Sequence, residues 1–477
     1  MRTERRGLLA ALAAILLAGC VTPVERTTPA AQVLGADKVE ASRVLAPDAA
    51  GGWPQARWWA VFGDRQLDAL VDEALAGHPT LRIAQARLAQ ASALVDAAVA
   101  SASPGVTGGL DVLHQRFSVS GTVPPPVAGT TRTTARLSMD FSYELDYANR
   151  NDAAIAAARA TEAAAGADAQ AARLALSSAV ARAYFQLQAL FAQREILGRE
   201  REQAERRVGL VRQRVSAGLE TEALLGRVGA VPPGLRASVA QLDAAVALAR
   251  NQLGTLTGKG PGRGLSIAAV PASASSSGAP GLPPALPLDL LGRRPDLVAA
   301  RWRVEAAVGE IDVARKRFLP NVNLIAFAGL ASLGMDRLLA AGSGIGGAGP
   351  AVRLPLFAAG GLQAGLRGRE ADYDLAVERY NELLLEAVRE VADQVQTRRV
   401  LESERVERRL AYEATERARR VALERYAAGI ANYLEVLDAE APLYELQRRA
   451  SDLSARAQLA EVGLYRALGG GYEDGRR

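Results

Sequence analysis

The chain has 477 residues, of which 49% are hydrophobic and 23% charged, so it carries enough apolar side chains to bury a core and is not expected to be disordered. Two histidines, one cysteine and three methionines argue against a His/Cys metal centre, a disulfide framework and a Cys–His catalytic pair. The net charge is only +5, and its basic residues are scattered among acids, whereas a nucleic-acid surface needs clustered Lys and Arg. We therefore expect no cofactor, no metal and no nucleic-acid partner.

The N-terminus has the pattern of a secretion signal. Three arginines among the first six residues precede an apolar run over 7–18, which is too short to span a bilayer as a helix. Leu-Ala-Gly then stands directly before Cys20 and matches the bacterial lipobox, in which the cysteine receives lipid and becomes the new N-terminus. A chance cysteine after an ordinary signal is the alternative, but Cys20 is the only cysteine in the chain. We expect 1–19 to be removed and 20–63 to form a lipid anchor and an extended tether.

Landmarks recur along the chain at nearly constant spacing. Pro79 and Pro295 are 216 residues apart, and Gly218 and Gly429 are 211 apart. Such spacing predicts an internal duplication. The predicted segments are 64–258 for the first repeat, 259–288 for a connector rich in Gly, Pro and Ser, 289–469 for the second repeat, and 470–477 for a tail.

Residues 137–147 alternate in the way that is typical of a β-strand. All six odd positions are apolar or aromatic, and all five even positions are polar or charged. A half-buried sheet of a soluble protein and a lipid-facing strand with a water-lined face both show this alternation, and the secretion signal favours the second. The other predicted strands are 106–112 in the first repeat, and 321–328 and 351–357 around a glycine-rich loop at 342–349 in the second.

Four strands are too few to close a membrane barrel, because the smallest such barrels have about eight. An open sheet edge cannot lie in lipid, since its backbone groups would have no hydrogen-bond partners. If these strands are in the membrane, the protein must therefore be an oligomer.

Each strand pair is followed by a long helical tract without proline. The tracts 151–217 and 362–428 predict helices of about 67 residues, or about 100 Å at 1.5 Å per residue. A soluble coiled coil would explain such tracts equally well. The shorter helices are expected at 66–102 with a kink at Pro79, at 220–258 with a break at Pro232-Pro233, at 289–318 and at 431–468; we expect 220–258 to continue into 289–318 and 431–468 into 66–102.

Short motifs accompany this plan over about 58–469. They are the lipobox Cys20, Trp58-Trp59 with Phe62-Gly63-Asp64 and Leu67, Arg293-Arg294-Pro295-Asp296-Leu297, Leu354-Pro355-Leu356-Phe357 with Gly360-Gly361, and Tyr426-Ala427-Ala428-Gly429 followed by Asn432-Tyr433-Leu434. In this order, and with the duplication, they resemble the outer membrane factor family, the TolC-like channels, and among them the NodT/OprM-like lipoprotein branch.

The resemblance implies a mainly α protomer with a small β part, and an assembly that is a trimer. Four transmembrane strands from each copy would close a 12-strand β-barrel, and the long periplasmic helices a 12-helix α-barrel. Members of this branch are outer-membrane exit ducts of tripartite RND efflux systems, in contact with a periplasmic adaptor and an inner-membrane pump. The resemblance therefore implies a lipid-anchored channel in the outer membrane of a Gram-negative bacterium that passes drugs and toxic compounds.

The resemblance also assigns roles to residues at the helix turns. Gly218-Leu219 and Gly429-Ile430 correspond to the tips that meet the adaptor, although a glycine there is also an ordinary helix stop. Tyr426, Leu434 and Asp438 correspond to the periplasmic gate, three copies of Asp438 forming an acidic ring that favours cations. Asp438 as an ordinary solvated residue is the alternative. The chain departs from the family at Ala441, where relatives carry an arginine, so one expected ion pair is missing or built differently.

Three other functions compete with this one. An enzyme is not expected, because the chain has no phosphate loop, no metal-ligand cluster and no nucleophile motif. A TolC-like duct for type I protein secretion would share the same fold. A lipid-anchored periplasmic coiled-coil scaffold would explain the signal and the helices, but not the alternating strand at 137–147.

Overall fold

The computed structural model describes residues 22–26, 29–35, 38–39, 52–270, 292–355 and 358–473. The predicted signal, Cys20, most of the predicted connector and Leu356-Phe357 lie outside the described residues. The chain divides into two units, which are taken in turn: Met1–Val33, Leu88–Ala165 and Ala300–Tyr380 in the first, and Leu34–Arg87, Gly166–Ala299 and Asn381–Arg477 in the second.

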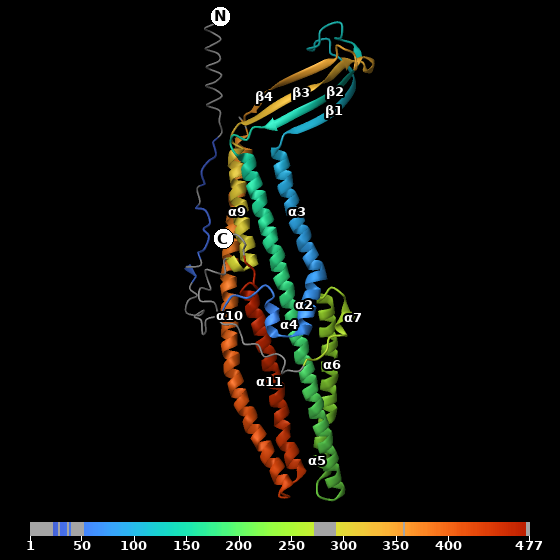
Figure 1. Ribbon diagram of the computed structural model, residues 1–477, viewed down its shortest axis with the longest axis vertical. Helices are drawn as coiled ribbons and strands as arrows, with labels where there is room; N and C mark the ends of the chain where they lie inside the picture. Colours follow the sequence, from blue (N-terminus) through green and yellow to red (C-terminus); the bar gives the residue numbers. More distant parts are fainter. Residues whose placement is uncertain are drawn as a thin grey trace. The chain divides into compact units, whose positions relative to one another are not determined.

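The elements alternate as the duplication predicts (Figure 1). The helices are α2 (Arg65–Gly77), α3 (Pro79–Ala102), α4 (Arg150–Ser216), α5 (Glu222–Gly229), α6 (Val231–Leu256), α7 (Pro261–Gly264), α9 (Pro295–Lys316), α10 (Ala359–Ala427) and α11 (Tyr433–Ala467), with short 3-10 helices η2 (Trp58–Phe62) and η4 (Met335–Arg337). The strands are β1 (Gly105–Arg116), β2 (Thr131–Glu144), β3 (Asn321–Leu333) and β4 (Gly344–Arg353).

The first unit holds one antiparallel sheet of the described strands, in the order β1-β2-β3-β4. The register places Val106 opposite Phe141 and Leu110 opposite Leu137, so apolar side chains share one face. Asp140 lies on the other face, where Ser138 donates a 2.8 Å hydrogen bond to its carboxylate. The alternation predicted for 137–147 is confirmed over 137–144, where the two kinds of side chain separate onto opposite faces, but β2 ends at Glu144 and the last three predicted residues are not strand.

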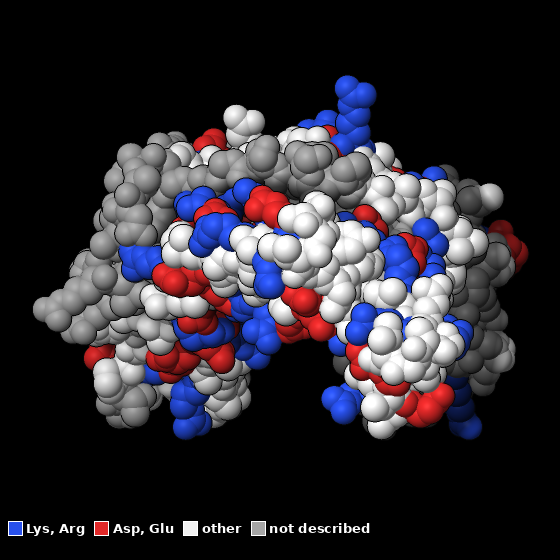
Figure 2. Space-filling view, turned by 90° about the horizontal axis from the view of Figure 1, so that it is seen from below, with Lys and Arg blue, Asp and Glu red and all other residues white. Residues whose placement is uncertain are grey.

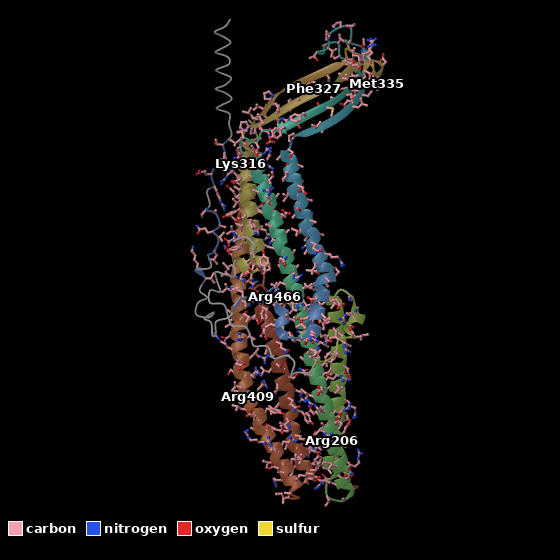
Figure 3. The ribbon with its side chains drawn as sticks, in the orientation of Figure 1. Arg206, Lys316, Phe327, Met335, Arg409 and Arg466 are labelled. Carbon is pink, nitrogen blue, oxygen red and sulfur yellow. The ribbon has the colours of Figure 1, made fainter. Side chains whose placement is uncertain are left out.

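The prediction for the second strand pair was partly wrong. The predicted glycine-rich loop at 342–349 is mostly strand, since β4 begins at Gly344 and ends at Arg353. Glycine does not prevent pairing here, because its backbone bonds to β3 as any residue would. At Gly347 the missing side chain is needed: a Cβ there would lie 2.9 Å from the Phe327 ring. The turn instead occupies 334–343, and Figure 3 shows Met335 at that end of the sheet and Phe327 along β3.

The long helices α4 and α10 have 67 and 69 residues, which confirms the predicted lengths. The predicted kink at Pro79 is a complete break, because His78 is extended, with ψ 135°, as a residue before proline prefers. The break predicted near Pro232 is found at Ala230, and Pro232 lies in the first turn of α6, where a proline costs no helical hydrogen bond.

The helices of the second unit stack in another order than predicted. The end of α6 meets the α2–α3 junction, where a Cβ on Gly258 would lie 3.4 Å from the Gly77 carbonyl oxygen. The end of α11 meets the start of α9, where a Cβ on Gly469 would lie 1.9 Å from the Arg293 carbonyl oxygen. Each repeat therefore closes on its own first helix, and the predicted exchange between repeats was wrong.

An aromatic core holds α2, α4, α6 and α11 together in the second unit. Trp58 stacks on Tyr465, with ring centroids 5.5 Å apart, and Phe62 meets Phe185 edge-on at 4.8 Å. Asp64 caps α2 through the amides of Gln66 and Leu67 and also accepts a 2.5 Å hydrogen bond from the Tyr184 hydroxyl. None of the described helices contains a stretch that is both long and apolar enough to cross a bilayer.

Candidate functional site

The two long helices end in turns of the same construction. Gly218 and Gly429 have φ of 74° and 72°, a left-handed conformation in which any other residue would be strained. The next amide reaches back in both turns: Leu219 N–H donates to the Arg214 carbonyl at 2.8 Å, and Ile430 N–H to the Arg425 carbonyl at 3.0 Å. This is the Schellman pattern that stops a helix, so the ordinary reading of both glycines as helix stops holds.

Each turn also exposes an apolar side chain. Leu219 is 64% exposed and Ile430 is 69% exposed, although both are large hydrophobic residues. The following helices start on equivalent caps, with Thr221 accepting from Leu224 N–H and Asn432 accepting from Glu435 N–H. The turns therefore hold Leu219 and Ile430 outward on rigid backbone.

The three predicted gate residues lie around the α10–α11 turn. The Tyr426 ring is 44% exposed and packs on Tyr433, with centroids 5.2 Å apart. Leu434 is partly buried in the first turn of α11. Asp438 is one turn further along α11, and it is half exposed and bonded to the Arg207 guanidinium at 2.6 Å.

The sequence did not reveal that Arg207 is the partner of Asp438. Arg207 lies on α4, in the other repeat, and next to it Gln203 donates a 2.7 Å hydrogen bond to the carbonyl of Leu437. These two contacts tie α4 to α11. Ala441 of α11 carries no charge, so the cation near this part of α11 is Arg207 from α4. No sequence signal marked Arg207, because it belongs to a run of similar charged residues.

Ion pairs continue along the helix seams of the second unit. They are Arg194–Asp243 between α4 and α6, Arg448–Glu200 between α4 and α11, and Arg419–Glu440 and Arg456–Glu404 between α10 and α11. The described surface in Figure 2 accordingly shows both signs intermixed rather than one charged patch. Figure 3 shows Arg206 on α4 and Arg409 on α10 within these charged stretches.

Two acidic groups in this region are perturbed by burial. Burial raises the pKa of Glu461 on α11 to about 7, against the opposing charge of Arg398. Burial also raises the pKa of Glu200, despite the opposing charge and hydrogen bond of Arg448. The described residues contain no group of His, Cys, Asp and Glu that could hold a metal ion.

A buried ionic network occupies the start of α9. Arg294 is 7% exposed and donates 2.7 Å hydrogen bonds to Asp296 and to Glu390 of α10. Burial alone would raise the pKa of Asp296, but the hydrogen bond and charge of Arg294 outweigh it and lower that pKa. We call these three residues the Arg294 network. The sequence showed the Arg293–Leu297 motif but gave it no role. Its place in the fold indicates that it stabilises the contact between α9 and α10.

The comparisons with known proteins agree with this architecture. The family described as outer membrane efflux protein matches residues 70–259 and 286–470. The fusaric acid resistance protein FusA of Burkholderia cepacia is 35% identical over 369 residues, which are 76% of this chain and 69% of that protein. The multidrug resistance outer membrane protein MdtP of Escherichia coli K12 is 31% identical over 479 residues, 96% of this chain and 95% of that protein.

Solved structures give the same answer. The outer membrane protein VceC of Vibrio cholerae has a TM-score of 0.79 at 34% identity, over 88% of this chain and 100% of that one. The outer-membrane channel OprN has a TM-score of 0.80 at 28% identity, over 95% and 99%. The family consists of efflux channels rather than enzymes. This chain therefore belongs to the outer membrane efflux protein family and is an efflux channel protein of the outer membrane.

Proposed function

We propose that this chain is the lipid-anchored exit duct of a tripartite RND-type efflux system and works as a homotrimer. The observation that carries the proposal is the four-stranded sheet, in which β1 and β4 each pair on one side only among the described residues. Its apolar face suits lipid, but its open edges do not, because unpaired backbone groups are costly there. Edge-to-edge association of three copies gives twelve strands and removes the edges.

The same proposal accounts for the ends of the chain. Residues 1–19 are removed, Cys20 carries lipid, and 20–63 anchor the protein, while 64–258 and 289–469 are the two repeats of each protomer. The described part of the anchor segment contacts α10, where Arg26 pairs with Asp374 and Ala31 N–H donates to the same carboxylate at 3.0 Å.

The helix turns are proposed as the adaptor contacts. Leu219 and Ile430 are exposed on rigid backbone, which suits docking against the hairpin of a periplasmic adaptor. Tyr426, Leu434 and Asp438 are proposed as the gate, with Leu434 as an apolar constriction. The pairing of Asp438 with Arg207 makes the predicted acidic ring depend on that ion pair, because the carboxylate is partly neutralised while the pair is formed.

The cargo is proposed to be small organic molecules. Relatives of this chain are named for resistance to several drugs and to fusaric acid, which favours small compounds over secreted proteins. The inner-membrane pump would select among them, and the duct would discriminate mainly by size and charge.

The first experiment is the mass of the detergent-extracted protein, native and denatured, for the wild type and Cys20→Ala. A trimer whose subunits lose a lipid increment in the variant supports both anchor and assembly. A lipidated monomer would contradict the duct and favour a periplasmic scaffold.

The second experiment separates small-molecule efflux from protein secretion. A deletion strain complemented with the wild type should regain resistance to small drugs, and Leu219→Asp with Ile430→Asp should abolish this while the trimer remains intact. If the deletion strain keeps its normal drug susceptibility but no longer exports a protein, type I secretion would be favoured instead.

A further inference from the structure

The N-terminal segment contacts one face of α10. Val24 exchanges two hydrogen bonds with the Gln363 side chain, at 2.9 and 3.2 Å, and Asp374 holds Arg26 and the amide of Ala31. Gln363 and Asp374 are eleven residues apart, close to three helical turns, so they lie on one face of α10. In the proposed duct this segment starts at the lipid on Cys20, so that face of α10 lies outside the duct wall.

The opposite face of α10 borders a groove shared with α9. Gly365 is nine residues from Asp374, and Asp372 is nine residues from Gln363, which is two and a half turns in each case. The groove has a volume of about 350 Å³, within the range of small-molecule sites. Its lining includes Ala314, Arg317, Gly365, Leu366, Arg369 and Asp372, and we call it the α9–α10 groove.

The floor of this groove is apolar and buried. Leu366 is 1% exposed and Ala314 is 8% exposed, and both pack with Phe318 in one buried cluster. A Cβ on Gly365 would meet no atom within 4 Å, so the space in front of the helix is open in the protomer. An apolar ring or chain can therefore lie on the floor without displacing protein atoms.

The groove lining includes two arginines, Arg317 and Arg369, and one carboxylate, Asp372. Arg369 is bonded to Asp372 at 3.1 Å and lies 3.7 Å from Glu310. Arg317 is exposed, and no carboxylate of the described residues pairs with it. A guanidinium binds a carboxylate with two parallel hydrogen bonds, so Arg317 above an apolar floor favours a carboxylate attached to an apolar body.

We propose that the α9–α10 groove is a contact site for aromatic carboxylates on the inner wall of the duct. The inference rests on the proposed function, since it takes the outer face of α10 from the lipid anchor and the inner face as its opposite. Figure 3 places Lys316 where α9 gives way to the sheet, directly before Arg317 in the chain. Three copies would present three such sites at one level of the duct.

The test is the block of single-channel current by benzoate in planar bilayers that contain the purified trimer. Benzoate should block the wild type, and Arg317→Gln should raise the blocking concentration about tenfold. Arg315→Gln is the matched control, because Arg315 is also exposed, lies two residues before Arg317 in the last turn of α9 and is absent from the groove lining. Benzyl alcohol, which has the ring but no charge, should block weakly and equally in all three proteins.

A second variant tests the floor without changing charge. Gly365→Leu fills the open space and should weaken the benzoate block at least fivefold while chloride conductance stays the same. Equal effects of Arg317→Gln and Arg315→Gln would overturn the inference in favour of a general charge effect. Loss of the trimer in Gly365→Leu would overturn it in favour of an interface between copies, and a wild-type protein that forms no channel would refute the proposed function itself.

Discussion

The two repeats form the same junction with different chemistry. In each repeat we call the helix that runs back from the turn, α6 or α11, the return helix. The glycine that follows it, Gly258 or Gly469, contacts the residues just before a proline that starts a helix. The two glycines are 211 residues apart, the same spacing as that of the two helix turns. In the first repeat the residue before the proline is His78, whose ring accepts the Thr80 amide at 3.2 Å and remains near the surface. In the second repeat it is Arg294, which is buried among carboxylates.

This difference shows that the duplicated backbone does not require one kind of contact. The first junction is supported by apolar packing and by the ion pairs of Glu73 with Lys259 and Arg263, and the second by the Arg294 network. A substitution at His78 breaks none of these ion pairs, whereas removal of Arg294 leaves two carboxylates without their buried cation. The two junctions should therefore respond very differently to equivalent substitutions.

The largest effect is expected for Arg294→Met. The substitution leaves Asp296 and Glu390 without their buried cation, so we expect a loss of about 3–5 kcal/mol in the free energy of unfolding. The matched change His78→Met should cost less than about 1 kcal/mol, as is usual for substitutions away from buried networks. Chemical denaturation of the detergent-extracted protein measures both, and a triple variant with Asp296→Asn and Glu390→Gln should recover part of the loss. Equal losses at the two junctions would contradict the comparison.

The next effect separates the two junction glycines. Gly258 and Gly469 have φ of 75° and 86°, so alanine at either position costs about 1–3 kcal/mol of backbone strain. Only at Gly469 would the new Cβ also collide with a carbonyl oxygen, at 1.9 Å against 3.4 Å at Gly258. Gly469→Ala should therefore lower the melting temperature clearly more than Gly258→Ala. A reversed order would show that the first junction is the tighter of the two.

The sequence predicted the elements well and their lateral contacts poorly. Helix lengths follow from local signals, such as the absence of proline over α4 and the glycine at 218, and these were confirmed. Which return helix stacks on which first helix depends on contacts such as Gly258 with Gly77, and nothing local to either glycine reveals them. The first part of β4 was predicted to be a loop because it is rich in glycine, although the absence of a side chain at Gly347 makes room for the Phe327 ring.

The candidate site was predictable only where a motif marked it. The turn at Gly429-Ile430 was predicted from the end of the long helical tract, and the structure has a turn at these two residues with Ile430 exposed. Arg207 was not predictable, because one arginine among several on α4 has no distinguishing neighbour, and only the packing of α4 on α11 selects it for Asp438. The α9–α10 groove was missed for the same reason, since its residues come from separate helices.

A smaller, pH-dependent effect should distinguish the second return helix from the first. Glu461 of α11 corresponds, at the 211-residue spacing, to Arg250 of α6. Burial raises the pKa of Glu461 from 4.5 to about 7, so the folded protein holds this proton more tightly than the unfolded chain. Its charge therefore costs no stability below pH 4.5, and the cost grows as the pH rises through 7, up to about 3 kcal/mol before solvent screening is considered.

Glu461→Gln tests this expectation, because the amide cannot ionise. The variant should be more stable than the wild type at pH 8 and about equal to it at pH 4.5, as measured by melting temperature at the two pH values. Glu435→Gln is the control, since Glu435 is exposed at the start of the same helix and should show no such difference. A constant difference between wild type and variant at both pH values would contradict a raised pKa.

The smallest expected effect on stability concerns the ion pair beside the α10–α11 turn. At the same spacing Asp438 corresponds to Arg227 and Arg207 to Ala418, so the equivalent pair between α10 and α5 cannot form. Because the pair is partly exposed, a double-mutant cycle with Arg207→Ala and Asp438→Ala should give a coupling of about 0.2–1 kcal/mol. Its effect on conductance should be larger than its effect on stability, since the pair joins α4 to α11 beside the proposed gate. Either single variant should therefore raise the open probability of the purified trimer in planar bilayers, whereas Arg194→Ala, which breaks the α4–α6 pair with Asp243, should not. If all three variants leave conductance unchanged, the ion pair serves only to align the helices and the gate lies elsewhere.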